Sequence, residues 1–346
     1  MERETPVAPK RYIVGPLYDW CWFLLPPVVS LAIGIAISDT SFSARTFLFD
    51  GEEVSASGLV IGTLIHAHLV AVFVRSHANP EIFRQHRWRF VLVPIVLLVA
   101  LATSAYIAIA ATVVATFWDV WHSGAQTFGF ARIYDRNQGN PPELGRRLDF
   151  WLNQVVYAGP ILGGVSLMDH VDSFAAFDAV DAPFFSSIPA RVAGQAKTLT
   201  LVVVTLGGLF ILYYLYAYWR FHRQGYRVSP LKIYLLVSTA ACSIYSWGFN
   251  TWGEAFFIMN LFHAVQYLGL VWASESTRVL RRLRLEGRRY GRLIGGALGL
   301  AAVCGYGFLA KAANPSRELF WSVTIVVSLL HFWYDGFIWS VRKREI

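Results

Sequence analysis

The chain has 346 residues, of which 55% are hydrophobic and only 15% are charged, and its formal net charge is +8. Long apolar runs recur from Asp19 to the C-terminal region, a composition that excludes an ordinary soluble enzyme and indicates a polytopic membrane protein. The positive charge lies mostly in loops between these runs, so it predicts contact with anionic inner-leaflet lipid and no nucleic-acid binding. We therefore expect a protein integral to a bacterial inner (cytoplasmic) membrane.

Windows of roughly twenty residues predict about ten transmembrane helices in a single all-α domain that covers residues 1–346. The expected spans, in chain order, are 20–37, 58–74, 90–107, 110–130, 150–168, 199–219, 233–248, 255–273, 293–310 and 320–340. Because residues 90–133 are almost continuously apolar, this count requires a tight turn near residues 107–110.

The loops between the expected spans alternate between basic and acidic. Basic loops cover 75–89, 132–147, 220–227, 278–292 and 342–344, whereas acidic loops cover 50–53 and 169–181. The positive-inside rule then places both termini in the cytoplasm.

Two of the connecting segments are distinctive. The outer segment 169–197 is long enough to form a re-entrant or surface helix that acts as a lid. In the basic segment 275–292, leucines alternate with arginines, which predicts a short helix on the inner leaflet or, as an alternative, a docking surface for a soluble partner.

Histidines recur at one depth of the predicted bundle. They are His66 with His68 in the second span, His122 in the fourth, His263 in the eighth and His331 in the tenth. All four spans run from outside to inside, and at about 1.5 Å per residue the histidines fall within about 6 Å of one another in depth. Imidazoles are costly in lipid, so this coincidence predicts a metal or haem near the bilayer midplane; the alternative is that each histidine packs in the core and bonds a carbonyl.

The polar neighbours of two of these histidines share their helix faces. Asp119, His122 and Gln126 lie at i, i+3 and i+7 of one face, and His331 and Asp335 lie at i and i+4 of another. Carboxylate and imidazole together are a ligand set for non-haem iron, manganese or zinc, and a carboxylate can also orient a ligand imidazole. We expect Asp119 and Asp335 to act as metal ligands and Asp119 and Gln126 to take part in catalysis.

The helix that carries His263 shows the same pattern, with Asn260 and Tyr267 on the same face and Gln266 at its edge. We expect Tyr267 to be catalytic, since its hydroxyl can donate a hydrogen bond to a bound oxygen species; a core tyrosine is the alternative. The string 118–129 around His122 interleaves aromatic, small and polar residues, as expected where a bulky apolar substrate lies against a ligand-bearing helix.

The remaining candidate ligands are less regular. His66 and His68 diverge by about 200° around a helix, so they cannot both face one metal unless the helix is distorted. His77 and His86 lie in the predicted inner loop 75–89. They either fold back to make the centre dinuclear or are interfacial and solvated.

A multi-pass bundle with histidines near one plane resembles the histidine-cluster membrane oxygenases and desaturases. That resemblance implies a non-haem di-iron centre and a fatty acyl or other lipophilic substrate. The family carries HxxxH and HxxHH strings, whereas this chain has HxH at residues 66–68 and otherwise isolated histidines. The resemblance is therefore one of architecture, and it transfers no residue role.

Three classes of function follow from these observations. We expect an iron-dependent, mononuclear or dinuclear, membrane oxidoreductase that acts on a lipophilic small-molecule substrate. A haem-binding redox protein and a metal-ion or proton transporter are the alternatives. Because the chain has no flavin, nicotinamide or iron–sulfur motif, an oxygenase or desaturase would take its electrons from a partner, such as a soluble donor docked on the basic inner face.

Overall fold

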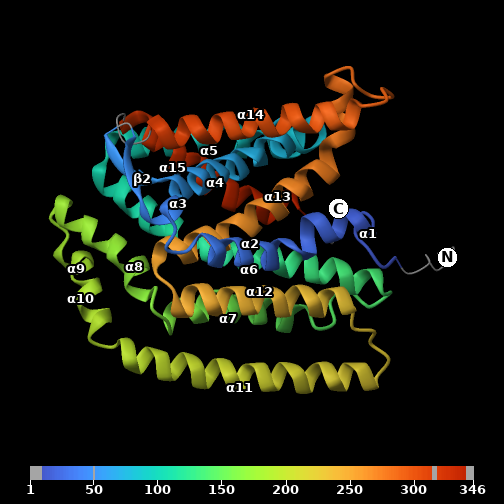
Figure 1. Cartoon of the computed structure of the whole chain (residues 1–346), viewed down its shortest axis with the longest axis horizontal. Helices are drawn as coiled ribbons and strands as arrows, with labels where there is room; N and C mark the ends of the chain where they lie inside the picture. The colour runs from blue at the N-terminus through green and yellow to red at the C-terminus, as the bar shows by residue number, and fades with distance from the viewer. Residues whose placement is uncertain (1–9, 50, 314–317, 340–346) are drawn as a thin grey trace.

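The structure is a computed structural model that describes residues 10–49, 51–313 and 318–339. It is a bundle of long helices that lie roughly side by side, with a group of short helices at one end (Figure 1). The chain begins with α1 (Pro16–Asp19), the π-helical turn η1 (Trp20–Leu24) and α2 (Pro26–Ile37). The two parts of this segment meet at a bend of 46°, where Pro26 has no backbone N–H to continue the helix.

The next elements are α3 (Ser41–Ala44) and an antiparallel hairpin of β1 (Thr46–Phe49) and β2 (Glu52–Ser55). They lead into four long helices and a set of short ones. The four are α4 (Ala56–Ser76), α5 (Pro80–Thr103), α6 (Ala105–Asn137) and α7 (Arg146–Leu162). The short set contains α8 (Leu167–Val171), the 3-10 helix η2 (Asp172–Val180), α9 (Pro183–Ser186) and α10 (Ile188–Ala193).

The C-terminal half is a second series of long helices. They are α11 (Ala196–Arg223), α12 (Pro230–Phe249), α13 (Trp252–Arg282), α14 (Gly291–Ala313) and α15 (Glu318–Ile338). Helix α13 is the most buried of the candidate membrane spans and packs against α2, α4, α12 and α14. The centre of the bundle is therefore built around α13.

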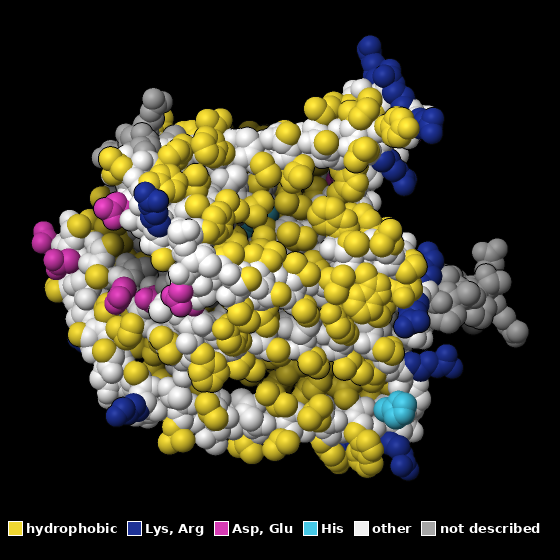
Figure 2. Space-filling view, in the orientation of Figure 1, with side chains coloured by type: hydrophobic (Ala, Val, Ile, Leu, Met, Phe, Trp, Pro, Cys, Tyr) yellow, Lys and Arg dark blue, Asp and Glu magenta, His cyan; other side chains and the backbone are white. Residues whose placement is uncertain are grey.

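Seven of the described helices are long and apolar enough to cross a membrane, namely α4, α5, α6, α11, α13, α14 and α15. The bent pair of α1–η1 and α2 makes eight if it is counted as one span. The chain is thus a helical membrane protein, while the count of ten and the side on which the termini lie stay predictions. In Figure 2, Lys and Arg gather mainly at one end of a broad hydrophobic surface and Asp and Glu at the opposite end.

The turn between the third and fourth expected spans lies earlier than residues 107–110. Helix α5 ends at Thr103, and Ser104 has an extended backbone with φ −140° and ψ 109°. The backbone N–H of Ile107 donates to the Ser104 hydroxyl over 3.3 Å. Ser104 is therefore the N-cap of α6, and this cap rather than any interruption of hydrophobicity separates the two helices.

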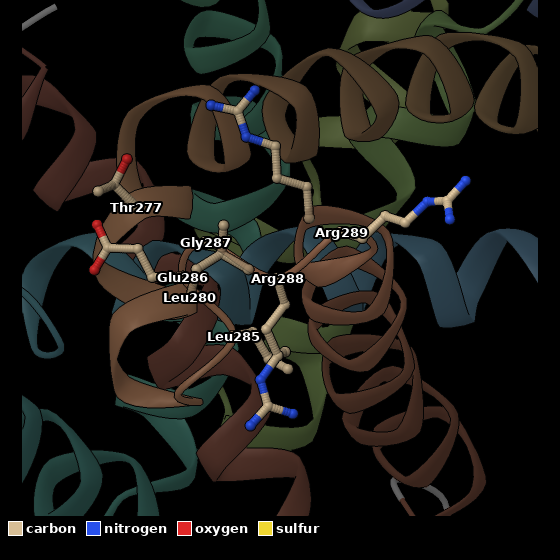
Figure 3. Close-up of a pocket in the computed structure, with 8 residues that line it drawn as sticks. Thr277, Leu280, Leu285, Glu286, Gly287, Arg288 and Arg289 are labelled. Carbon is tan, nitrogen blue, oxygen red and sulfur yellow. The ribbon is translucent and has the colours of Figure 1, made fainter.

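The expected surface helix in the basic segment 275–292 is also wrong. Residues up to Arg282 continue α13, and the chain then turns through Arg284 and Gly287, both with positive φ (55° and 76°). Two residues in the left-handed region are incompatible with a continuous helix. Figure 3 shows a small pocket at this turn, with arginine side chains that point in different directions, so they do not converge on one anion.

The outer segment 169–197 forms the short helices α8–α10 at the end of the bundle (Figure 1). Its phenylalanines pack on the first half of α6: the ring centroids of Phe177 and Tyr106 are 5.5 Å apart and those of Phe174 and Phe117 are 5.9 Å apart. A surface helical element is thus present here, and its role as a lid stays a prediction.

Candidate metal centre

Four helices each bring one histidine to the same point of the bundle. His68 of α4, His122 of α6, His263 of α13 and His331 of α15 are all buried, with at most 4% of each exposed. The ring centroid of His263 lies 5.1 Å from that of His68 and 5.2 Å from that of His122. The ring centroid of His331 lies 4.8 Å from that of His122 and 5.0 Å from that of His68. Imidazoles that bind one ion at about 2.1 Å have ring centres roughly 4.6–5.3 Å apart. The ring spacing therefore matches that of imidazoles around one ion, while the donor atoms fall into two groupings that share His331.

Four nitrogens of this cluster make no hydrogen bond of good geometry within the described residues. Neither Nδ1 nor Nε2 of His68, and neither nitrogen of His263, has a partner within the described part of the chain. An unmade hydrogen bond at a buried polar group costs roughly 1–3 kcal/mol. The two rings meet at 90°, but a contact between an N–H and a ring face is weak and leaves the lone pairs unpaired. These orphaned lone pairs fit a bound cation.

Asp335 completes a second set of donor atoms. Its Oδ2 lies 3.7 Å from Nε2 of His122 and 3.7 Å from Nε2 of His331, and these two nitrogens are 3.1 Å apart. Two donors held about 2.1 Å from one ion at a tetrahedral angle are about 3.4 Å apart. A first-row metal ion therefore fits among these three atoms without a large rearrangement.

The other oxygen of Asp335 is held by two donors. The Tyr267 hydroxyl donates to Oδ1 over 2.9 Å and Nε1 of Trp339 donates to it over 2.8 Å. Arg75 stacks over the Trp339 ring at 4.2 Å and pairs with buried Glu275 at 2.8 Å. These contacts fix the carboxylate so that Oδ2 faces the imidazoles.

The tautomer of His331 is also fixed. Its Nδ1 donates to the Leu69 carbonyl over 3.2 Å, because a carbonyl oxygen can only accept. The lone pair of Nε2 therefore faces Asp335 and His122, and the Nε2 of His122 lies at hydrogen-bond distance, 3.1 Å. A ligand histidine that donates its other N–H to a backbone carbonyl is the usual arrangement in metal sites.

Gln126 lies directly beside the cluster. Its Nε2 is 3.3 Å from both the His263 carbonyl and Oε1 of Gln266, so it joins α6 to α13, while its own Oε1 has no partner among the described residues. Gln266 in turn donates to the Phe23 carbonyl over 2.7 Å. The predicted polar stripe on these helices thus contains the histidine cluster and an amide pair that joins the helices.

The remaining predicted ligands lie elsewhere. His66 is half-buried, and its Nδ1 donates to the Gly62 carbonyl of its own helix over 2.7 Å. His77 accepts from the Ser76 hydroxyl over 2.8 Å and donates from Nε2 to the Phe90 carbonyl over 3.2 Å. Both nitrogens of His77 are thus occupied, and burial lowers its pKa.

His86 and Asp119 are not brought to the cluster either. The expected inner loop 75–89 is mostly helix, so His86 lies within α5, at a kink with φ −126°, where its ring packs on Phe337. Asp119 belongs to neither grouping of metal-ligating atoms found in the described residues, which are His68 with His263 and His331, and His122 with His331 and Asp335. The rotation of α6 thus presents His122 to the centre without Asp119.

A cavity of about 590 Å³ reaches the centre from one side. It touches His122, Tyr267 and Asp335, and aromatic side chains line it. Its lining comes from α6, α7, α13, α15 and the connection between α6 and α7, and its volume falls within the roughly 300–1,000 Å³ of pockets that hold small molecules. The donor set therefore has one side that a ligand can approach.

Sequence reasoning missed two residues that orient the carboxylate. Trp339 lies at i+4 from Asp335, on the same face, and this spacing was a sufficient signal. Arg75 was assigned only to topology, and nothing in the sequence connects it with Trp339, because that contact joins distant segments.

Comparison with known proteins gives no further assignment, since no family model, curated protein or solved structure matches the chain.

Proposed function

We propose that the protein is a metal-dependent membrane oxidoreductase with a non-haem centre, iron first among the candidates, that acts on a lipophilic substrate. The observation that carries this proposal is the convergence of four buried imidazoles and one carboxylate, in which four imidazole nitrogens have no hydrogen-bond partner among the described residues. Mixed nitrogen and oxygen donors of this kind suit iron, manganese and zinc. When bound, such an ion supplies Lewis-acid or one-electron chemistry to a ligand in the adjoining cavity.

The tautomer of His331 favours one ion over two. His331 belongs to both groupings of donor atoms, but its Nδ1 is bonded to the Leu69 carbonyl, so Nε2 alone is available. Two ions would have to share that single lone pair. We therefore propose His68, His122, His263, His331 and Asp335 as ligands of a mononuclear centre; five donors leave one position of an octahedral ion for a substrate or for oxygen.

The same geometry favours a non-haem centre over haem. The Nε2 atoms of His122 and His331 are 3.1 Å apart, whereas axial ligands on the two faces of a haem iron lie about 4 Å apart with the porphyrin between them. The carboxylate that stands 3.7 Å from both imidazoles is a further donor that a haem iron does not need.

The residues around the cavity have assignable roles. Tyr267 and Trp339 hold Asp335 in place, and the rings of Phe332 and Trp121 give the cavity an apolar wall that excludes water from a ligand. Gln126 lines the cavity and joins α6 to α13 through its amide nitrogen, which holds this part of the wall in place.

Oxygen uptake tests this function. The purified protein is loaded with ferrous iron, supplied with an artificial reductant and an extract of membrane lipids, and compared with His263→Ala treated in the same way. We expect uptake only with the unchanged protein, together with a new oxidised or desaturated lipid by mass spectrometry. A Soret band in the purified protein, or equal uptake by both proteins, would overturn the proposal.

A further inference from the structure

The far end of the cavity beside the metal centre is strongly basic. Arg136, in the last turn of α6, and Arg146 and Arg147, in the first turn of α7, line it together with Glu143. Arg146 and Arg147 are exposed, and Arg136 is half-buried. Three guanidinium groups against one carboxylate leave this end of the cavity with a net positive charge.

A fourth arginine at this end, Arg132, makes buried hydrogen bonds within the protein. Its Nη1 donates to Asp149 over 2.6 Å, and its Nη2 donates to the carbonyls of Pro142 and Leu144 over 2.8 Å and 3.0 Å. Lys232 bonds the same Asp149 at 2.8 Å. This buried network fixes the connection between α6 and α7, and therefore fixes the backbone from which Arg146 and Arg147 project.

Between the basic end and the metal ligands, aromatic side chains form most of the cavity wall. Trp121, Phe128, Phe150 and Phe332 line this stretch. Two glycines also face it, and a Cβ added at Gly129 would meet no atom within 4 Å. The cavity thus runs from cationic side chains through an aromatic passage to the donor atoms of the centre.

We propose that this cavity binds a single-chain amphiphile whose small anionic head group, a carboxylate or a phosphate, pairs with Arg146 and Arg147 and whose apolar chain extends to the metal centre. Arginine pairs with either anion through parallel hydrogen bonds. A methylene group takes up about the volume of a water molecule, roughly 30 Å³, so a cavity of about 590 Å³ holds about twenty such groups. That volume suits one chain.

This inference rests on the proposed function only for the chemical fate of the ligand, so binding is measured without metal. The full chain carrying His263→Ala is placed in nanodiscs of phosphatidylcholine. Three probes with the same chain length are titrated: palmitate, hexadecyl phosphate and hexadecanol. We expect at least one of the anionic probes to bind about tenfold or more tighter than the alcohol, and the ratio between the two anions identifies the head group.

Two sets of variants locate the binding. Arg146→Gln with Arg147→Gln removes two charges from the mouth, and Arg288→Gln with Arg289→Gln removes two from the basic turn that the cavity does not reach. Only the first pair is expected to reduce anion binding about tenfold. Gly129→Leu fills the passage while leaving every charge in place, so we expect it to weaken the binding of all three probes.

Several results would overturn the inference. Equal affinity for the alcohol and both anions would show that the arginines do not select a head group. If both double arginine variants lost anion affinity equally, the binding would reflect general attraction by a positive surface and no specific site. Anion-selective binding without any metal-dependent oxidation would keep this inference and refute the proposed function.

Discussion

Replacing Asp335 by Asn tests the geometry of the centre most sharply, because the two carboxylate oxygens have different partners. Tyr267 and Trp339 both donate to Oδ1, so an asparagine will place its amide oxygen there. Its NH2 group then occupies the position of Oδ2, 3.7 Å from the imidazole nitrogens of His122 and His331. The variant therefore loses a donor atom and directs positive hydrogens toward the metal position.

Loss of an orienting contact around a metal typically costs 10–100-fold in affinity, and loss of a ligand costs at least as much. We expect Asp335→Asn to weaken metal binding by about tenfold to a hundredfold, which is roughly 1.4–2.8 kcal/mol. The measurement is a competition titration with a chelator on the purified protein, followed by metal analysis.

Asp119→Asn is the matched control, since it makes the same chemical change three residues from His122. The structure leaves Asp119 outside the donor groupings. We therefore expect the metal affinity of Asp119→Asn to stay within about twofold of that of the unchanged protein. A large loss in Asp119→Asn together with unchanged binding in Asp335→Asn would refute this assignment and restore the prediction made from the sequence.

Three further predictions follow from the same structure. His68→Ala is expected to remove bound metal, whereas His66→Ala is expected to keep it, and metal content per chain in the two purified variants distinguishes these outcomes. Tyr267→Phe keeps the aromatic packing and removes one donor to the carboxylate, so a chelator titration should show an affinity lower by about tenfold; an unchanged value would mean that this hydrogen bond does not orient the ligand. In a cysteine-free background, a membrane-impermeant thiol reagent added from outside should modify Asp178→Cys and spare Leu285→Cys; the reverse pattern would contradict the topology.

The sequence was sufficient to predict which helices meet at the centre. Depth along a helix can be counted from residue positions, and His122, His263 and His331 lay at one depth with polar neighbours on their faces. The 200° divergence of His66 and His68 predicted that only one of them can reach a shared point, and the structure brings His68 there.

The rotation of each helix could not be predicted. Asp119 and Asp335 are equivalent in the sequence, since each lies one helical turn from a histidine, and only the packing of α6 and α15 decides which carboxylate faces the centre. Contacts between distant segments, such as Arg75 on Trp339, are invisible for the same reason. The arginines at the cavity mouth were predicted only as part of a basic inner surface, because their position beside the passage depends on the connection between α6 and α7.

Metal content of the purified protein tests the central claim most directly. The protein is purified in detergent from cells supplied with iron, manganese and zinc, and the metals are counted per chain alongside a variant that combines His68→Ala and His263→Ala. We predict about one first-row metal ion per chain, iron foremost, with no Soret band, and its loss in the double variant. An unchanged protein that folds and yet carries no more metal than the double variant would contradict the account.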